Sequence, residues 1–188
     1  MTQWSSLEKD CLNCQKCGLC STRHHVVFGA GNPQAPVLFV GEGPGEREDL
    51  EGIPFVGRAG QLLDKLLAAV DLDREKDLYI TNMVKCRPPQ NRDPKPEEQE
   101  ACMEWLRQQV ALMLMKPDMK ITREHGKIFK KGDLLMMATL HPAALLRNPS
   151  AKPGAFEDFL RLQRLLQENG QTKSGRRASA GNPRDSII

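Results

Sequence analysis

Four of the six cysteines form two pairs that lie far apart in the chain. The first pair is Cys14-x2-Cys17 and the second is Cys86-x15-Cys102. Four thiolates fit one soft metal centre better than they fit a disulfide scheme, because zinc and iron-sulfur clusters both take four cysteine ligands. The glycine-rich stretch VLFVGEGPG lies between the pairs, so the pattern predicts a metal centre beside a site rather than on a tail.

The spacing leaves two questions open. It does not distinguish zinc from an iron-sulfur cluster. In addition, Cys11 and Cys20 extend the first pair to C-x2-C-x2-C-x2-C, which could hold a metal alone and leave Cys86 and Cys102 as ordinary residues. That run matches the bacterial ferredoxin spacing only in part, because it lacks the proline-terminated end.

Length and composition indicate a cytoplasmic metalloprotein. The 188 residues suffice for one domain with a core, which we expect over residues 1–168. A net charge of +3 permits contact with nucleic acid without requiring it. The chain has no apolar run of membrane-spanning length and no secretory signal at its start, so we expect no membrane contact. In a reducing cytosol, cysteines serve metal or redox chemistry more often than disulfides.

The apolar pattern predicts two buried strands with a helix between them. Residues 37–40 form a short apolar run that ends at GEGPG, which is typical of a parallel strand followed by a loop. Residues 59–70 carry leucines at helical spacing, and residues 78–81 form a second apolar run that ends at Asn82. Strand, helix and strand together predict a right-handed parallel crossover.

The rest of the chain predicts two more helices and a last strand. We expect a helix to begin at Pro96, because proline suits the first helical position. This helix carries Cys102 near its start. Residues 134–140 read as the last strand and residues 156–167 as the final helix. The chain is polar and basic over residues 169–188, where we expect a disordered tail.

Three polar or glycine-rich loops each follow a predicted strand. They are GEGPG, Asn82 and His141. Because ligands of open parallel sheets bind at the carboxyl ends of the strands, we expect the three loops to form one site. A glycine-rich turn after a strand also occurs in dinucleotide-binding folds, but GEGPGE lacks the sixth-position glycine of that fingerprint, and this signal is weak.

Over about residues 14–166, the chain closely resembles the iron-sulfur, type-four uracil-DNA glycosylases. The motifs that carry the resemblance are, in order, VVFGAGNPQAPVLFVGEGPGEREDLEGIPFVGRAGQLL, YITNMVKCRPPQNRDPKPEEQEAC and TLHPAALLRNP. The resemblance implies an α/β fold with a four-stranded parallel sheet and flanking helices. It also implies a 4Fe-4S cluster held by Cys14, Cys17, Cys86 and Cys102, and it gives Cys11 and Cys20 no role. The implied activity is that of a hydrolase of base excision repair, acting as a monomer on uracil-containing DNA and releasing free uracil.

The resemblance assigns base recognition to four residues. Phe55 stacks on a base that has been turned out of the helix. Asn82 reads the base edge, because its carbonyl matches the N3 donor of uracil and its amino group matches the O4 acceptor, an order that cytosine reverses. Gly41 and Gly43 let the backbone approach the base. By residue type alone, Phe55 could also be a core residue and Asn82 could cap a loop.

The resemblance assigns the bond-breaking step to two residues. His141 donates a hydrogen bond to O2 as uracil leaves with negative charge, and Glu42 positions water or opposes the positive charge of the sugar. After His141, Leu145 or Leu146 is a candidate wedge for DNA and Arg147 a candidate phosphate contact. Alternatively, both leucines belong to the core at the start of a helix.

One segment of the family pattern is absent from this chain. After the helix of Cys102 the family has a further strand and helix, whereas here QVALMLMKPDMK runs directly into Ile121. By the family topology, the absent strand lies inside the sheet between residues 37–40 and 134–140. Its loss would leave two strands without backbone partners, at about 1 to 3 kcal/mol for each buried unpaired group, or force them to pair with each other in a shifted register.

Two other functions compete with a working glycosylase. The absent strand favours a catalytically impaired relative that binds a cluster and DNA without turnover. If the four cysteines bind zinc instead, the chain is an interaction module.

Overall fold

The structure is a computed structural model that describes all residues except 1–2, 115–125, 127, 132–133 and 169–188. The chain divides into two compact units, Met1–Gly60 with Glu75–Met119, and Gln61–Arg74 with Lys120–Ile188. The single domain expected over residues 1–168 stays a prediction, and the expected tail over residues 169–188 lies outside the described residues. Among the described residues, no helix has the length and hydropathy that crossing a membrane requires.

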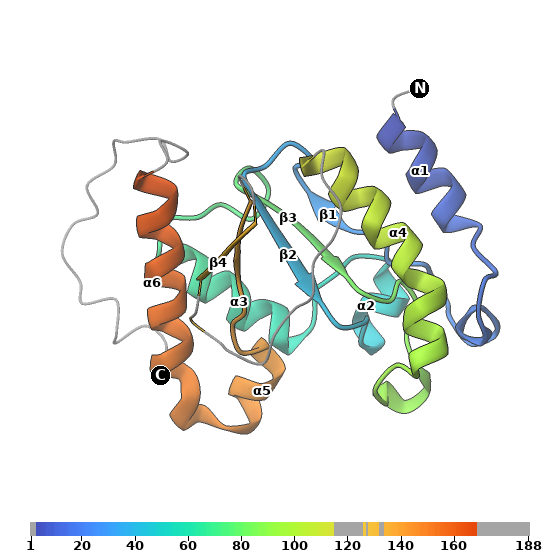
Figure 1. Ribbon diagram of the computed structural model, residues 1–188. Helices are drawn as coiled ribbons and strands as arrows, with labels where there is room; N and C mark the ends of the chain where they lie inside the picture. The colour runs from blue at the N-terminus through green and yellow to red at the C-terminus, as the bar shows by residue number, and fades with distance from the viewer. Residues whose placement is uncertain (1–2, 115–125, 127, 132–133, 169–188) are drawn as a thin grey trace. The chain divides into compact units, whose positions relative to one another are not determined.

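The first unit contains a three-stranded sheet in the order β1-β3-β2 (Figure 1). β2 (Val37–Gly41) and β3 (Leu78–Asn82) pair in parallel, and β1 (Ala30–Gly31) pairs antiparallel with the other edge of β3. The two strands that the apolar runs predict are therefore parallel neighbours, joined through α3 (Arg58–Ala68) as expected. β3 is buried along its whole length, because it lies between the other two strands.

The α/β class is confirmed, and the described strands do not form the complete four-stranded parallel sheet of the family, in which one central strand was expected to be absent from this chain. β5 (Leu134–Met137), the strand expected at residues 134–140, pairs antiparallel with β4 (Ile128–Lys131) in a separate two-stranded sheet. Two residues separate β4 from β5, a connection that permits only an antiparallel pair. Among the described strands, β2 pairs with β3 alone, so it forms the edge of its sheet where the family topology has another strand.

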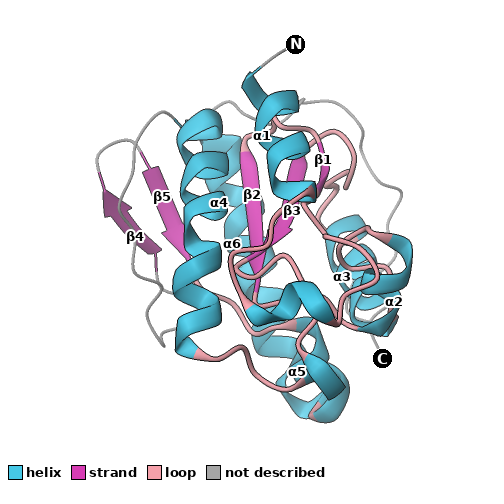
Figure 2. Ribbon diagram, turned by 90° about the vertical axis from the view of Figure 1, so that its right-hand side faces the viewer, coloured by secondary structure: helices cyan, strands magenta, loops and turns pink. Residues whose placement is uncertain are grey.

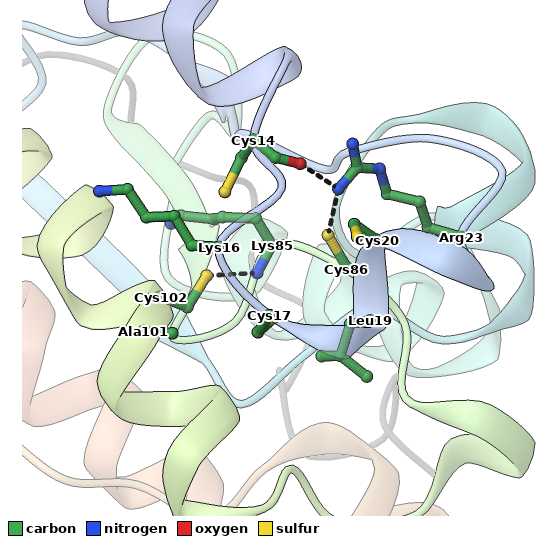
Figure 3. A pocket seen from close by; sticks show the side chains of 10 residues that line it. All are labelled: Cys14, Lys16, Cys17, Leu19, Cys20, Arg23, Lys85, Cys86, Ala101 and Cys102. Carbon is green, nitrogen blue, oxygen red and sulfur yellow. Dashed lines mark hydrogen bonds between the residues drawn. The ribbon is translucent and has the colours of Figure 1, made fainter.

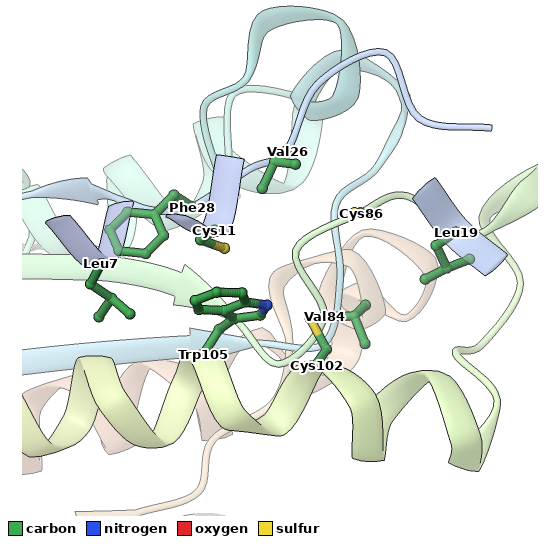
Figure 4. Packing of buried hydrophobic residues seen from close by; sticks show 9 residues of the cluster. All are labelled: Leu7, Cys11, Leu19, Val26, Phe28, Val84, Cys86, Cys102 and Trp105. Carbon is green, nitrogen blue, oxygen red and sulfur yellow. The ribbon is translucent and has the colours of Figure 1, made fainter. Parts of the chain in front are cut away.

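Helices α1 (Gln3–Leu12) and α4 (Pro96–Leu114) lie side by side in the first unit (Figures 1 and 2). Apolar residues from both helices pack with others from the loops, and Figure 4 shows this cluster around the Trp105 ring. The buried members are Leu7, Cys11, Leu19, Val26, Phe28, Val84, Cys86, Cys102 and Trp105. The apolar core of the first unit thus includes Cys86 and Cys102, and the other two expected metal ligands, Cys14 and Cys17, pack against it.

The start of α4 is fixed by a carboxylate. Glu98 accepts hydrogen bonds from Arg92 Nη1 at 2.8 Å, Arg92 Nη2 at 2.6 Å and the Lys95 backbone N–H at 2.8 Å. The last of these satisfies a backbone donor that the helix start leaves unpaired. The bonds from Arg92 are the main reason why the pKa of Glu98 falls to about 2. Cys102 lies one turn farther along the same helix.

Shorter helices complete the first unit. α2 (Glu46–Glu51) ends at Gly52, whose φ of 73° gives the left-handed C-cap that glycine adopts readily. Two short 3₁₀ helices are η1 (Gly18–Ser21) and η2 (Pro89–Asn91).

The second unit holds the rest of α3 together with α5 (Pro142–Arg147), the 3₁₀ helix η3 (Pro149–Ala151) and α6 (Lys152–Glu168). The side chain of Gln163 donates to the backbone carbonyl of Val70 at 2.9 Å, which ties α6 to the end of the α3 segment. Thr139 donates to Asp158 at 2.7 Å and joins α6 to the segment after β5.

Candidate active site and metal centre

The carboxyl ends of β2 and β3 bring together three of the predicted site residues. Gly41 and Asn82 are register partners across the parallel pair. A Cβ atom on residue 41 would collide with Asn82 Oδ1 and would lie 2.8 Å from Cζ of Phe55. The amide and the phenyl ring therefore meet over the glycine backbone, as expected for GEGPG and Asn82 at one sheet edge.

The side chain of Asn82 is buried with one atom unsatisfied. The residue is 1% exposed, and its Oδ1 has no hydrogen-bond partner among the described residues. A buried acceptor without a donor costs about 1 to 3 kcal/mol, and most buried polar atoms in folded proteins are satisfied. An orphaned acceptor between a glycine and an aromatic ring is suited to receive an N–H donor of a flat ligand.

Phe55 adopts a backbone conformation that is unusual for its residue type. Its φ is 55°, in the left-handed region that bulky residues rarely occupy. The turn is held by Glu48, whose Oε1 accepts hydrogen bonds from the backbone N–H groups of Val56 at 3.0 Å and Gly57 at 2.8 Å. Glu48 therefore fixes the segment that carries the ring, a role that the sequence analysis did not predict.

Glu42 and Gly43 continue the edge formed by Gly41. The carbonyl of Glu42 accepts from the backbone N–H of Val84 at 3.0 Å, while its carboxylate is exposed and bonds to no other described residue. A Cβ on Gly43 would lie 2.8 Å from the Val84 side chain, closer than real Cβ atoms come. The backbone at residue 43 can follow this path because the residue is glycine.

His141 lies in the second unit, where it is the N-cap of α5. Its Nδ1 accepts a hydrogen bond from the backbone N–H of Ala143 at 3.2 Å, so the proton of a neutral ring lies on Nε2. Leu145 is fully buried, which contradicts a wedge role, whereas Leu146 and Arg147 are exposed. The meeting of His141 with the loops at the ends of β2 and β3 stays a prediction.

The four cysteines predicted as ligands line one cavity in the first unit (Figure 3). They come from three segments: the loop after α1, the loop after β3, and α4. Cys20 lines the same cavity, whereas Cys11 is fully buried in the apolar core (Figure 4). The remaining lining residues are Lys16, Leu19, Arg23, Lys85 and Ala101. The arrangement favours the ligand set from two distant pairs over a set confined to the N-terminal run.

Three N–H groups donate to the sulfur atoms of these cysteines. The distances are 3.4 Å from Arg23 Nη1 to Cys86, 3.2 Å from Trp105 Nε1 to Cys14, and 3.2 Å from the Lys85 backbone to Cys102. Such outer donors orient metal ligands and stabilise the negative charge of thiolates. None of the three donors stood out in the sequence, because no motif marks them.

The cavity disfavours free thiolates. Burial raises the pKa of Cys86 to about 11, and it also raises the pKa values of Cys17 and Cys102. These thiols therefore keep their protons at neutral pH unless a cation replaces them. Burial also lowers the pKa of Lys85 to about 8.

The described residues include no group of three or more His, Cys, Asp or Glu side chains arranged to hold a single metal ion. An all-sulfur donor set suits a soft centre.

The profile of the uracil DNA glycosylase superfamily matches residues 28–164. The chain belongs to this superfamily. It is 37% identical to the type-4 uracil-DNA glycosylase of Archaeoglobus fulgidus, over 92% of this chain and 98% of that protein. It is 38% identical to that of Saccharolobus solfataricus, over 90% and 92%. The type-4 uracil-DNA glycosylase of Thermotoga maritima is 40% identical, over 84% of this chain and 91% of its own.

Each of two alignments contains more positions than the number of residues of this chain that it includes. The alignment with the Archaeoglobus fulgidus glycosylase spans 197 residues, although it takes in 92% of a chain of 188. The alignment with the Saccharolobus solfataricus glycosylase spans 199 residues and takes in 90%. Both glycosylases therefore contain residues that this chain lacks, as the expected internal deletion requires.

Proposed function

We propose that the chain is a uracil-DNA glycosylase that hydrolyses the N-glycosidic bond of deoxyuridine in DNA and releases free uracil. The observation that carries the proposal is the buried Oδ1 of Asn82, which has no hydrogen-bond partner in the described part of the chain and lies between Gly41 and the ring of Phe55. Uracil is a flat ring with an N–H donor at N3, and it could supply the hydrogen bond that Asn82 Oδ1 lacks. Family membership and the names of the relatives support the same reaction.

Discrimination follows from the asparagine amide. Oδ1 accepts from N3–H of uracil, and the amino group of the same side chain donates to O4. Cytosine places an acceptor at N3, so it would leave Asn82 Oδ1 unsatisfied and set two acceptors against each other. Phe55 stacks on the base without distinguishing one pyrimidine from another.

His141 and Glu42 act on the bond that breaks. As the glycosidic bond lengthens, negative charge develops on uracil O2 and positive charge on the sugar. Because Nδ1 of His141 accepts from Ala143, the neutral ring carries its proton on Nε2 and donates from that atom to O2. The exposed carboxylate of Glu42 orients the attacking water or stabilises the positive sugar.

Cys14, Cys17, Cys86 and Cys102 would hold a 4Fe-4S cluster in the cysteine cavity. When bound, the cluster supplies four iron–sulfur bonds that join three segments of the chain. Its role is structural, because the loop that carries Cys86 continues directly from Asn82 at the end of β3. The protein acts on uracil-containing DNA as a monomer in the cytoplasm, and size-exclusion chromatography tests its oligomeric state.

The decisive experiment measures release of free uracil from a uracil-containing oligonucleotide by the purified, iron-loaded protein. We expect release from uracil DNA and none from cytosine DNA. N82A should lower the single-turnover rate by about 100-fold or more, because the base loses both edge contacts. N82D keeps the size of the side chain but places a carboxylate against O4, and it should be similarly impaired. No release by the iron-loaded wild type would refute the proposal.

A catalytically impaired relative that binds the cluster and DNA is the second candidate. Two observations favour it: the relatives contain residues that this chain lacks, and β2 is a sheet edge among the described strands. The same oligonucleotide assay separates the two functions. DNA binding and bound iron without release of uracil support the impaired relative, and turnover excludes it.

A further inference from the structure

Lys85 is one of the most deeply buried residues of the first unit. It is 1% exposed, and its Nζ donates to three oxygens: Thr81 Oγ1 at 2.6 Å, the Asn82 carbonyl at 2.7 Å and Gln109 Oε1 at 2.6 Å. Lysine is almost never fully buried without a special reason. All three protons of the ammonium group are used, so the side chain is fixed in one position.

The partners of Lys85 form a closed network of neutral groups. Thr81 Oγ1 and Gln109 Nε2 both donate to the carbonyl of Phe28, at 2.8 and 2.9 Å. Thr81 and Gln109 are themselves fully buried. No Asp or Glu of the described chain forms an ion pair with Lys85. A buried charge without an opposite charge is unfavourable, so negative charge brought to this part of the first unit would stabilise the ammonium group.

The same residue also borders the cysteine cavity. Lys85 lines that cavity, and its backbone N–H donates to Cys102 Sγ at 3.2 Å (Figure 3). Four thiolates on a cluster would bring negative charge to this place. One lysine therefore contacts the main chain of Asn82 through its side chain and a predicted cluster ligand through its backbone.

We propose that Lys85 is a positioning residue that joins the two sites: it fixes the main chain of Asn82 for uracil recognition, and it balances the negative charge of the cluster thiolates. The inference rests on the proposed function. It differs from a role in packing alone, because it requires the charge of the side chain and its bond to the Asn82 carbonyl.

Three variants of the iron-loaded protein test this inference. K85M removes the charge and the donors at similar length. In K85M, Gln109 Oε1 loses the donor that Lys85 supplies. The double variant K85M/Q109M removes this oxygen as well. If the unsatisfied oxygen is the cause of the lower stability of K85M, the double variant should regain much of that stability. K9M is the matched control, because Lys9 is exposed on α1 and contributes only its backbone carbonyl to a hydrogen bond with Asn13.

Two rates are measured for each variant. The first is the single-turnover rate of uracil release with enzyme in saturating excess, which does not depend on the fraction of inactive protein. The second is the rate of iron release to a chelator. Both Lys85 variants should release uracil about 10- to 100-fold more slowly than the wild type, because Asn82 is displaced from the base edge. Both should lose iron faster, and K9M should change neither rate.

The outcomes separate this inference from the proposed function. Wild-type rates of uracil and iron release in K85M/Q109M would show that Lys85 only satisfies Gln109, and they would overturn the inference. If neither Lys85 variant binds iron although K9M does, circular dichroism distinguishes two causes. Retained helix content would show that the charge of Lys85 is needed to hold the cluster, which supports the inference. Lost helix content would show that Lys85 contributes only to packing, which overturns it. No uracil release by the wild type overturns the proposed function itself.

Discussion

Gly41 lies opposite Asn82 across the parallel pair of β2 and β3, so close that a methyl group on residue 41 would overlap Asn82 Oδ1. The absence of a side chain at residue 41 is therefore a condition for the conformation of Asn82. It also leaves room for the ring of Phe55 beside the same backbone. The proposed base site therefore depends on this glycine as well as on the side chains of Asn82 and Phe55.

G41A should abolish most uracil release while the fold persists. The new methyl group must displace Asn82 or Phe55, and displacement of a positioning group by about 1 Å costs about 100-fold in rate. We expect a single-turnover rate lower by about that factor. G18A is the matched control, because a Cβ on Gly18 meets no atom within 4 Å. Wild-type rates in G41A would show that Asn82 does not need its observed position.

E48A should loosen the turn that holds Phe55. The substitution removes an ionised acceptor from two backbone N–H groups, each bond contributing about 1.5 to 3 kcal/mol when the partner is charged. We expect the free energy of unfolding to fall by about 2 to 4 kcal/mol and the uracil-release rate to fall with it. E48Q retains an amide oxygen at the same place and should keep most of both. Equal losses in E48A and E48Q would mean that charge, rather than the acceptor, holds the turn.

Cysteine substitutions should separate ligands from bystanders. C86S and C102S should each lose iron, because serine is a poor ligand for a soft metal. C20S should retain iron, although Cys20 lines the cavity. C11A should also retain iron, with about 1 kcal/mol less stability because a buried core group is lost. Iron and sulfide analysis of each protein provides the measurement. Iron loss in C11A and C20S but not in C86S or C102S would instead support the N-terminal run as the ligand set.

E98Q should change how stability depends on pH in the acid range. The pKa of Glu98 lies near 2 in the folded protein, below its value in the unfolded chain. Its stabilising effect is therefore fully present above about pH 4.3 and is lost as the pH falls toward 2. Denaturant unfolding of the wild type and E98Q should differ most above pH 5, and the difference should shrink toward pH 3. The cluster and the other carboxylates are common to both proteins, so the difference isolates Glu98. A constant difference across this range would exclude the ion pair with Arg92 as its cause.

The elements that the sequence predicted are those with a long or continuous apolar signal. β2, α3 and β3 begin and end within about two residues of the expected positions, and α4 begins at Pro96 as expected. The sequence analysis did not predict α1, although Trp4, Leu7 and Cys11 lie at helical spacing. β1 has only two residues and no apolar run, so no local pattern could reveal it.

The site was predictable where it follows strand ends and not where it depends on tertiary contacts. Gly41 and Asn82 meet because parallel strands end at the same edge, which the apolar runs already indicate. Glu48 and Lys85 act on segments whose proximity exists only in the folded chain. Lysine side chains are mostly exposed in folded proteins, so the residue type gives no indication that Lys85 is buried.

The cavity takes its sulfur atoms from residues made at very different times. Cys14 and Cys17 leave the ribosome first, and Cys102 follows 85 positions after Cys17. At about 5 to 20 residues per second, the interval is roughly 4 to 17 s. Throughout that interval the nascent chain carries reactive thiols without their later partners. If these thiolates hold the proposed cluster, iron delivery must wait until more than half of the chain has been made, and the early cysteines are exposed to oxidants until it occurs.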